Sequence, residues 1–324
     1  MRAILVTVLA AGLTLAAWAD VSKAAGGADA LHDQGANAEA VKLVLDSAPA
    51  ASGGKELAEL YWRAARDTLE LGDLAEQAGK SKDEILAVFA TGEGYADKAI
   101  SADPANDLGY YWKSANIGRW GQVKGILNAL SKASPMRDLL VKELSLNAER
   151  ADPYYVLGEL YREVPGWPAS FGNVDAAVSL GRRAVDTRAR QVQQGTEKMD
   201  YSFITELAKT LYKRNWSAAV RIAEQQKKKE KLASAATPLD KASLYEATVT
   251  LSDQSDRQEA RGLVQEVVTD LERLPALTAP QKKDLGKAKD VLKGWSRGAR
   301  PAACPGGDWC WECGGSSPSG GSPW

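Results

Sequence analysis

The chain has 324 residues, of which 44% are hydrophobic and 26% charged, a composition typical of soluble globular proteins. Its 41 basic and 42 acidic residues nearly cancel, which argues against nucleic acid as a partner. With one histidine and three cysteines, the commonest catalytic and metal-binding side chains are scarce.

The first 19 residues have the pattern of a secretory signal peptide. Arg2 provides a positive start, Ile4–Leu15 an apolar stretch too short for an ordinary membrane span, and Ala17-Trp18-Ala19 a small-x-small cleavage site. We therefore expect the mature chain to begin at Asp20 in the periplasm, a retained membrane anchor being the alternative. No cysteine follows the apolar stretch, so no lipid anchor is expected.

Residues 20–54 are predicted to be an N-terminal extension with one short helix, after which a long helix should run over 55–71. Gly72 and Gly79 are expected to bracket a connection. Ser81 should cap the next helix, which ends before Asp103-Pro104 because proline cannot continue a helix.

The segment 107–122 is rich in aromatic residues and is predicted to be helical, with further helices over 123–131 and 135–146. Not all of its aromatic side chains can lie on one buried stripe. The residues of this segment that attract interest as a binding surface are Tyr110, Trp112, Asn116, Arg119 and Trp120.

The clearest repeat pattern spans 151–186. Tyr154, Leu157, Gly158 and Tyr161 recur at i, i+3, i+4 and i+7, which is one stripe of a helix. Glycine costs helix stability, roughly 1 kcal/mol relative to alanine, so Gly158 predicts close approach of a second helix. The facing small residues would be Ala177, Gly181 and Ala184.

An insertion over 163–172 interrupts this repeat. Two prolines, two glycines, Trp167 and Phe171 indicate an ordered loop. We expect Trp167 and Phe171 either to plug the repeat core or to form one wall of a cleft facing the 110–120 helix.

Further helix pairs are predicted at 201–231 and 239–274, with a last helix over 281–295. The basic run 227–231 should be a solvated helix end. The predicted fold is all-α, with tetratricopeptide-like antiparallel helix pairs stacked in a right-handed solenoid. The repeat core would span 55–235, and helices within 236–297 would continue it.

The segment 298–324 is rich in Gly, Ser, Pro and Cys and is expected to be a disordered tail. A disulfide with one free thiol is an alternative. A metal site is another, although Cys304, Cys310 and Cys313 provide only three ligands.

No arrangement of residues predicts catalysis, a metal site or a cofactor. His32 is the only histidine, so a catalytic triad would have to use it, yet it precedes the expected repeat core. A carboxylate pair is the one enzymatic alternative, and no pattern singles one out.

The repeat pattern resembles the tetratricopeptide superfamily. Two motifs, Tyr111-Trp112-x3-Asn116-x2-Gly118-Arg119-Trp120 and Pro165-Gly166-Trp167-Pro168-x2-Phe171-Gly172-Asn173-x2-Ala176, are similar to the T-component of TRAP transporters. The organisation also resembles the bacterial relatives of regulators of microtubule dynamics. The T-component resemblance implies an all-helical periplasmic partner of a solute-binding protein with a hydrophobic cleft. Members of that family carry a lipid-attachment cysteine, which this chain lacks.

We therefore expect a non-catalytic binding or scaffold protein that takes a protein partner, such as a periplasmic solute-binding protein, or an apolar small molecule. A carboxylate-based periplasmic enzyme and an envelope-assembly adaptor are the alternatives. Beside the aromatic segment, the expected binding residues are Tyr155, Glu159, Arg162 and Trp167.

Overall fold

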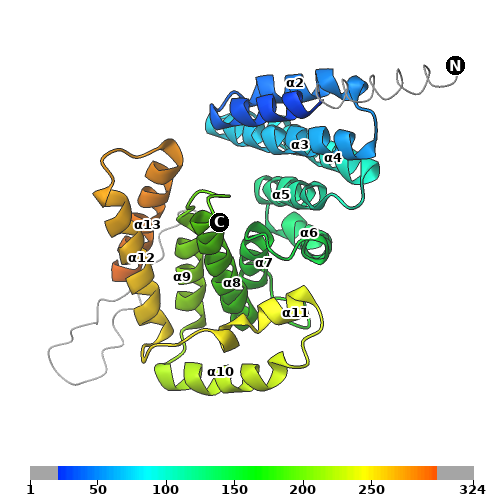
Figure 1. Cartoon of the computed structure of the whole chain (residues 1–324). Helices are drawn as coiled ribbons and strands as arrows, with labels where there is room; N and C mark the ends of the chain where they lie inside the picture. The colour runs from blue at the N-terminus through cyan, green and yellow to red at the C-terminus, as the bar shows by residue number, and fades with distance from the viewer. Residues whose placement is uncertain (1–20, 298–324) are drawn as a thin grey trace, which may run out of the picture.

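The computed structural model describes residues 21–297, apart from the side chains of 126–129 and 297, and this part of the chain is all-α (Figure 1). One isolated bridge joins Gly166 to Gly172. After a helix over 21–33, the helices are α2 (Asn37–Ser47), η1 (Ala48–Ala50), α3 (Gly54–Gln77), α4 (Lys82–Ala102), α5 (Asp107–Lys124), α6 (Ile126–Leu146), α7 (Asp152–Glu163), α8 (Val174–Gln193), α9 (Ser202–Arg214), α10 (Ala218–Leu232), α11 (Pro238–Ser243), η2 (Tyr245–Thr248), α12 (Asp256–Arg273) and α13 (Ala279–Arg297).

Side-chain caps fix several helix starts. Ser81 caps α4 in a capping box with Glu84, and Asn173 accepts hydrogen bonds from two backbone N–H groups at the start of α8. The Ser81 cap was predicted. Each cap satisfies N–H groups that would otherwise lack a partner at a helix end.

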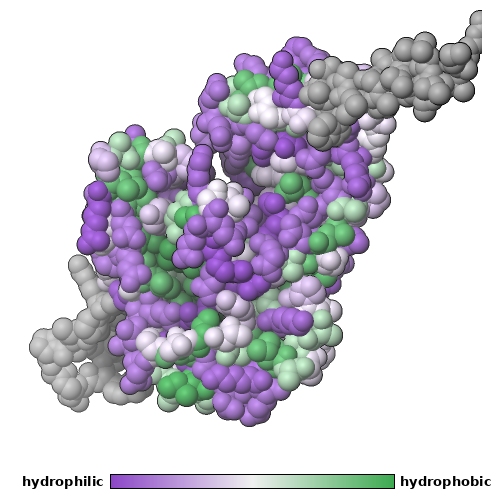
Figure 2. Space-filling model, viewed as in Figure 1, coloured by the Kyte–Doolittle hydropathy of each residue, from purple (hydrophilic) through white to green (hydrophobic). Residues whose placement is uncertain are grey.

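The predicted stacking of neighbouring helices is confirmed. One row consists of α3, α5, α7, α9 and α13, in which α3 packs on α5, α7 on α9 and α9 on α13. Helices α4, α6, α8 and α12 cover the other side of this row. The stack curves so that α13 faces α3 and α7: the charge of Lys283 acts on Glu70, and that of Lys287 on Glu159. We call the α3–α5–α7–α9–α13 side the concave face, and Figure 2 shows the surface hollowed between the α12–α13 end and the N-terminal helices.

Residues 21–50, predicted as an extension with one helix, form two helices that pack on α3. Val21, Ala28 and Val44 are buried against Leu60 and Ala64 of α3. The stack therefore begins more than 30 residues before the expected start at residue 55.

Three expected helix boundaries differ in the structure, at Gly72, near Gly125 and at Pro135. Gly72 lies inside α3, where a Cβ atom would come within 2.4 Å of the Phe89 ring, so this glycine permits close approach of α4. Gly125 separates α5 from α6 at φ 109°, a conformation that favours glycine. Pro135, expected to begin a helix, lies within α6.

The predicted pairs at 201–231 and 239–274 are wrong. Helix α9 pairs instead with α12, through Leu207 and Leu211 against Val264 and Leu271. The chain between them, 215–255, forms a separate layer of α10, α11 and η2 (Figure 1).

The reason is that α10 turns a polar face inward, made of Arg221, Gln225 and Lys228, and leaves Val220 and Ile222 exposed. Lys228 was expected in a solvated run. It is buried, and its Nζ donates to the carboxylates of Glu246 and Asp175, at 2.8 and 2.6 Å.

A cluster of buried charges fastens this layer to the stack. Arg214 Nη1 donates to Glu246 at 2.7 Å, and Arg214 Nε donates to Asp256 at 2.8 Å. The cluster contains four basic and four acidic residues, so its charge balances: Arg182, Arg214, Arg221, Lys228, Asp175, Glu246, Asp256 and Glu259. Buried charges need such pairing because desolvation is costly.

Candidate functional site

Three of the predicted binding residues, Tyr155, Glu159 and Arg162, lie on one face of α7, at i, i+4 and i+7. They meet Phe203, Glu206 and Thr210 of α9 on the concave face. We call these six residues the α7–α9 site. Helical spacing predicted the α7 half, but which helix lies opposite depends on the stacking.

Two aromatic rings form one end of this site. The Tyr155 and Phe203 rings stack with centroids 4.5 Å apart and planes 23° apart. Phe203 is buried, whereas Tyr155 is partly exposed to the concave face. Burial raises the pKa of Tyr155 well above its usual value, so the hydroxyl stays protonated and can donate a hydrogen bond.

Arg162 holds α7 to α9. Its side chain is buried, and its guanidinium donates to Thr210 Oγ1 and to the Glu206 backbone oxygen, both at 3.1 Å, and pairs with the Glu206 carboxylate at 2.8 Å. The Nε of Arg162 donates to Glu163 at 2.6 Å. Arg162, predicted to touch a partner, therefore has its donors engaged within the fold.

Glu159 is left with a weak counter-ion. Its carboxylate lies 3.7 Å from Arg162, which makes shorter contacts with Glu206 and Glu163. Burial, together with the negative charge of Glu206, raises the pKa of Glu159 to about 7. Burial would also raise the pKa of Glu206, but the positive charges of Arg162 and Lys209 outweigh burial and lower the pKa of that group.

The space enclosed at the α7–α9 site is small, about 10 Å³, which is enough for one water molecule at most. Tyr155, Glu159 and Glu206 line it with Gly158, Ala177, Gly181, Phe203, Leu207 and Thr210. The site is therefore a surface for contact in this conformation, not a cavity for a substrate.

The aromatic segment of α5 contributes mainly to the core. Asn116 is fully buried, and its Nδ2 donates to the backbone oxygens of Ala65 and Trp112 at 3.1 and 2.8 Å. Trp112 and Trp120 pack against the cluster of Leu69, Ile85 and Phe89. The prediction that Asn116 faces a ligand is wrong, because this side chain ties α5 to α3.

Arg119 does reach the concave face, but as a bridge between helices. Its Nε donates to Asp73 of α3 at 2.7 Å, and its Nη2 pairs with Glu76. The Arg119 side chain remains about a quarter exposed. A partner contacting it would have to share it with these two carboxylates.

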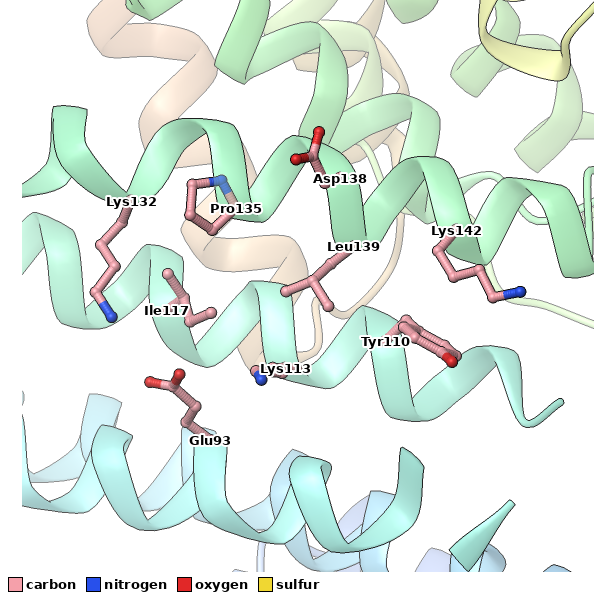
Figure 3. Close-up of a pocket in the computed structure, with 9 residues that line it drawn as sticks. All are labelled: Glu93, Tyr110, Lys113, Ile117, Lys132, Pro135, Asp138, Leu139 and Lys142. Atoms are coloured by element: carbon pink, nitrogen blue, oxygen red, sulfur yellow. The ribbon is translucent and has the colours of Figure 1, made fainter. Parts of the chain in front are cut away.

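Tyr110 lies away from the other predicted residues, in a shallow hollow of about 400 Å³ between α4, α5 and α6 (Figure 3). Ile117 and Leu139 point toward one another across it, and Asp138 points away. The lining residues are Glu93, Tyr110, Lys113, Ile117, Lys132, Pro135, Asp138, Leu139 and Lys142. Because they come from three helices, no local pattern could have revealed the hollow.

Trp167 is not packed. The residue is 89% exposed in the middle of the 163–172 loop, so the expectation that it plugs the core or covers a pocket is wrong. Phe171 does pack, edge-on to Tyr161 at 5.1 Å and beneath Arg137 of α6 at 4.6 Å. Backbone bonds from Gly172 N–H to Pro165 O and from Asn173 N–H to Tyr161 O hold the loop in one shape without Trp167.

His32 belongs to the stack instead of lying outside it. Its Nδ1 is 2.7 Å from Asp67 of α3, and the fully buried Asp67 also pairs with Arg66. Within residues 21–297, no group of three or more His, Cys, Asp or Glu side chains could hold a metal ion. No helix in the same range is long and apolar enough to cross a membrane.

These features define the class: an all-α helical-repeat protein with polar and aromatic side chains on its concave face. Residues 26–169 match the family model described as regulator of microtubule dynamics protein 1-3. The match extends from the first described helix to the loop after α7, so it includes Tyr155, Glu159 and Arg162 but not α9. The family comparison matches neither the TRAP T-component nor a tetratricopeptide family. No curated protein matches the chain.

Proposed function

We propose that this protein is a non-catalytic scaffold that binds a protein partner along its concave face. The observation that carries the proposal is Glu159: a partly exposed carboxylate with a distant counter-ion, beside the Tyr155–Phe203 stack. A lysine or arginine side chain from a partner would supply the missing charge and lay its aliphatic part on Tyr155. Partly exposed aromatic residues beside charged groups are typical of binding hot spots.

An apolar small molecule would have to bind outside the α7–α9 site. The α7–α9 site has space for one water, whereas the hollow between α4, α5 and α6 is in the size range of ligand pockets and has Ile117, Leu139 and Pro135 in its lining. A second ligand of this kind would therefore bind apart from the protein partner.

The finer assignments remain part of the proposal. The signal-peptide pattern supports export to the periplasm, where the partner would be a solute-binding protein of a TRAP-type transport system or a component of envelope assembly. The T-component motifs support the transport role.

The test is capture of a partner by the immobilised protein from a periplasmic extract, followed by affinity measurement with the captured protein. Tyr155→Ala and Glu159→Gln should each weaken binding about tenfold, as expected when a hot-spot contact is lost. Glu230→Gln, on the exposed side of α10, is the matched control and should bind as the wild type does. Unchanged affinity in both concave-face variants would refute the proposal, and recovery of a solute-binding protein would support the transport role.

A second candidate, carboxylate-based catalysis, has one observation in its favour. The pKa values of Glu159 and Glu206 are displaced in opposite directions, as in general acid and base pairs. The small enclosed volume opposes it, because a substrate would need the site to open. If the protein turns over a substrate and Glu159→Gln abolishes that turnover, the result would favour catalysis over the scaffold function.

A further inference from the structure

The stack has one thin joint, between α6 and α7. Among the consecutive helix pairs from α2 to α9, the contact between α6 and α7 is the smallest. The next-but-one contacts show the same break, because α3 and α5 share a broad contact whereas α5 and α7 barely meet. The helices within residues 21–146 therefore form one lobe and those within residues 152–297 form another, and the two lobes meet at this joint (Figure 1). Such a boundary is where relative motion of two rigid bodies costs least.

The joint has an apolar core that spans both lobes. Leu140 and Leu144 of α6 contact Tyr154 and Leu157 of α7, together with residues of α8, α9 and α11. Beside this core lies a buried carboxyl group, that of Glu143 on α6.

Glu143 is fully buried, at 0% exposure, and neither of its carboxyl oxygens has a hydrogen-bond partner. The cation beside it is Arg150, whose Nε lies 3.5 Å from Oε1 and whose Nη2 is also 3.6 Å from Asp152. A buried, unpartnered carboxylate is costly, which favours the neutral acid.

The other groups around Glu143 do little to favour its charge. From α5 come Asp107 and Tyr111, and from α7 comes Asp152, which pairs with Arg188 of α8 at 2.7 Å. From α11 the contacting residues are the apolar Leu239 and Ala242. Burial raises the pKa of Glu143 well above its usual value, Arg150 opposes this, and the negative charges of Asp152 and Asp107 add to it.

We propose that Glu143 makes this joint a proton-controlled hinge between the two lobes. With Glu143 neutral, the lobes pack closely around an apolar core. When Glu143 loses its proton, the joint opens to let water reach the carboxylate, because hydration removes the cost of the buried charge. The groups across the concave face, such as Glu70 of α3 and Lys283 of α13, then move apart. This change of shape does not depend on what the concave face binds.

The test is a distance measurement by pulsed electron spin resonance. Spin labels at the exposed positions Ala90→Cys on α4 and Lys293→Cys on α13 report on the two lobes, with Cys304, Cys310 and Cys313 replaced by serine. The label-to-label distance should lengthen or broaden between pH 5 and pH 9. Glu143→Gln, a neutral residue of the same shape, should keep the short distance at both pH values.

Glu39→Gln, on the exposed side of α2 in the same lobe and outside the joint, is the control and should respond as the wild type does. A distance that stays constant in the wild type, or that changes equally in Glu143→Gln, would overturn the proposal. If Glu143→Gln does not fold, Glu143→Met serves the same purpose with an apolar side chain of similar length.

Discussion

Gly158 of α7 lies directly against Gly181 of α8. A Cβ atom added at residue 158 would be 3.4 Å from the Gly181 nitrogen, 3.5 Å from the Ala177 carbonyl oxygen and 3.7 Å from Leu180 Cβ. One methyl group fits at these distances and a larger side chain does not. The close helix contact predicted for Gly158 is thereby confirmed.

The first prediction compares two substitutions at this position. Gly158→Leu should lower the free energy of unfolding by roughly 1–3 kcal/mol, because the side chain would overpack the α7–α8 contact. Gly158→Ala should be neutral or stabilising, since alanine gains helix propensity of up to ~1 kcal/mol. Urea denaturation measures both, and an unchanged midpoint for the leucine variant would contradict the packing.

The second prediction concerns the buried charges that hold the 215–255 layer. Glu246 pairs with Arg214 at 2.7 Å and with Lys228 at 2.8 Å. Burial opposes the charged form, but these cations and Arg182 outweigh it and lower the pKa of Glu246 well below its usual value. Glu246 therefore stabilises the fold above its unfolded pKa of about 4.3, and this contribution is lost as the pH falls below that value.

Glu246→Gln should accordingly lower stability by about 3–5 kcal/mol at pH 7, the usual cost of breaking a buried ion pair. The difference in the free energy of unfolding between Glu246→Gln and the wild type should shrink at acidic pH. Urea denaturation of both proteins at pH 7 and at pH 3 measures this difference. Glu272→Gln is the control, because its pair with Lys289 is about half exposed and should change stability by less than ~1 kcal/mol.

The third prediction separates the two aromatic residues of the 163–172 loop. Trp167→Ala should leave the free energy of unfolding within ~0.5 kcal/mol of the wild type, as for most exposed positions. Phe171→Ala should lower it by about 0.5–3 kcal/mol, because the ring contacts Tyr161 and Arg137. Thermal unfolding tests this, and a large loss in Trp167→Ala would mean that the indole packs in solution. Weaker partner binding with unchanged stability would instead show that Trp167 is a contact residue.

The fourth prediction concerns residues 1–19, which lie outside the described part of the chain. Export with cleavage after Ala19 should give a mature protein that begins at Asp20 and has no attached acyl group. The intact mass of the protein from the periplasm measures this. A mass that includes residues 1–19, or one increased by fatty acids, would contradict it.

Local features of the fold could be predicted because neighbouring residues determine them. Tyr154, Leu157 and Gly158 are buried as their spacing indicates, and the Ser81 hydroxyl caps its helix by accepting a hydrogen bond from the backbone N–H of Glu84, three residues later. Glycine was ambiguous, since the same residue can break a helix, as at Gly125, or let another helix approach, as at Gly72. Only the neighbouring helix distinguishes these two uses.

The candidate site was half predictable. Helical spacing placed Tyr155, Glu159 and Arg162 on one face, but their chemical roles depend on α9, whose Glu206 lies 44 residues after Arg162. Glu206 and Thr210 engage Arg162 and leave Glu159 short of a counter-ion. At Trp167 the sequence predicted burial from the apolar side chain, yet the residue is exposed, because backbone hydrogen bonds hold the loop without it.

The sequence by itself therefore determined the helical class, most helix starts and the apolar stripe of α7, because these depend on interactions within about one helical turn. Tertiary structure alone decided that α9 pairs with α12, that α10 buries its charges, and that Glu143 and Glu159 lie where their ionisation is unfavourable. The physical reason is that burial and electrostatic environment are sums over groups brought together from distant parts of the chain, and no local pattern contains those sums.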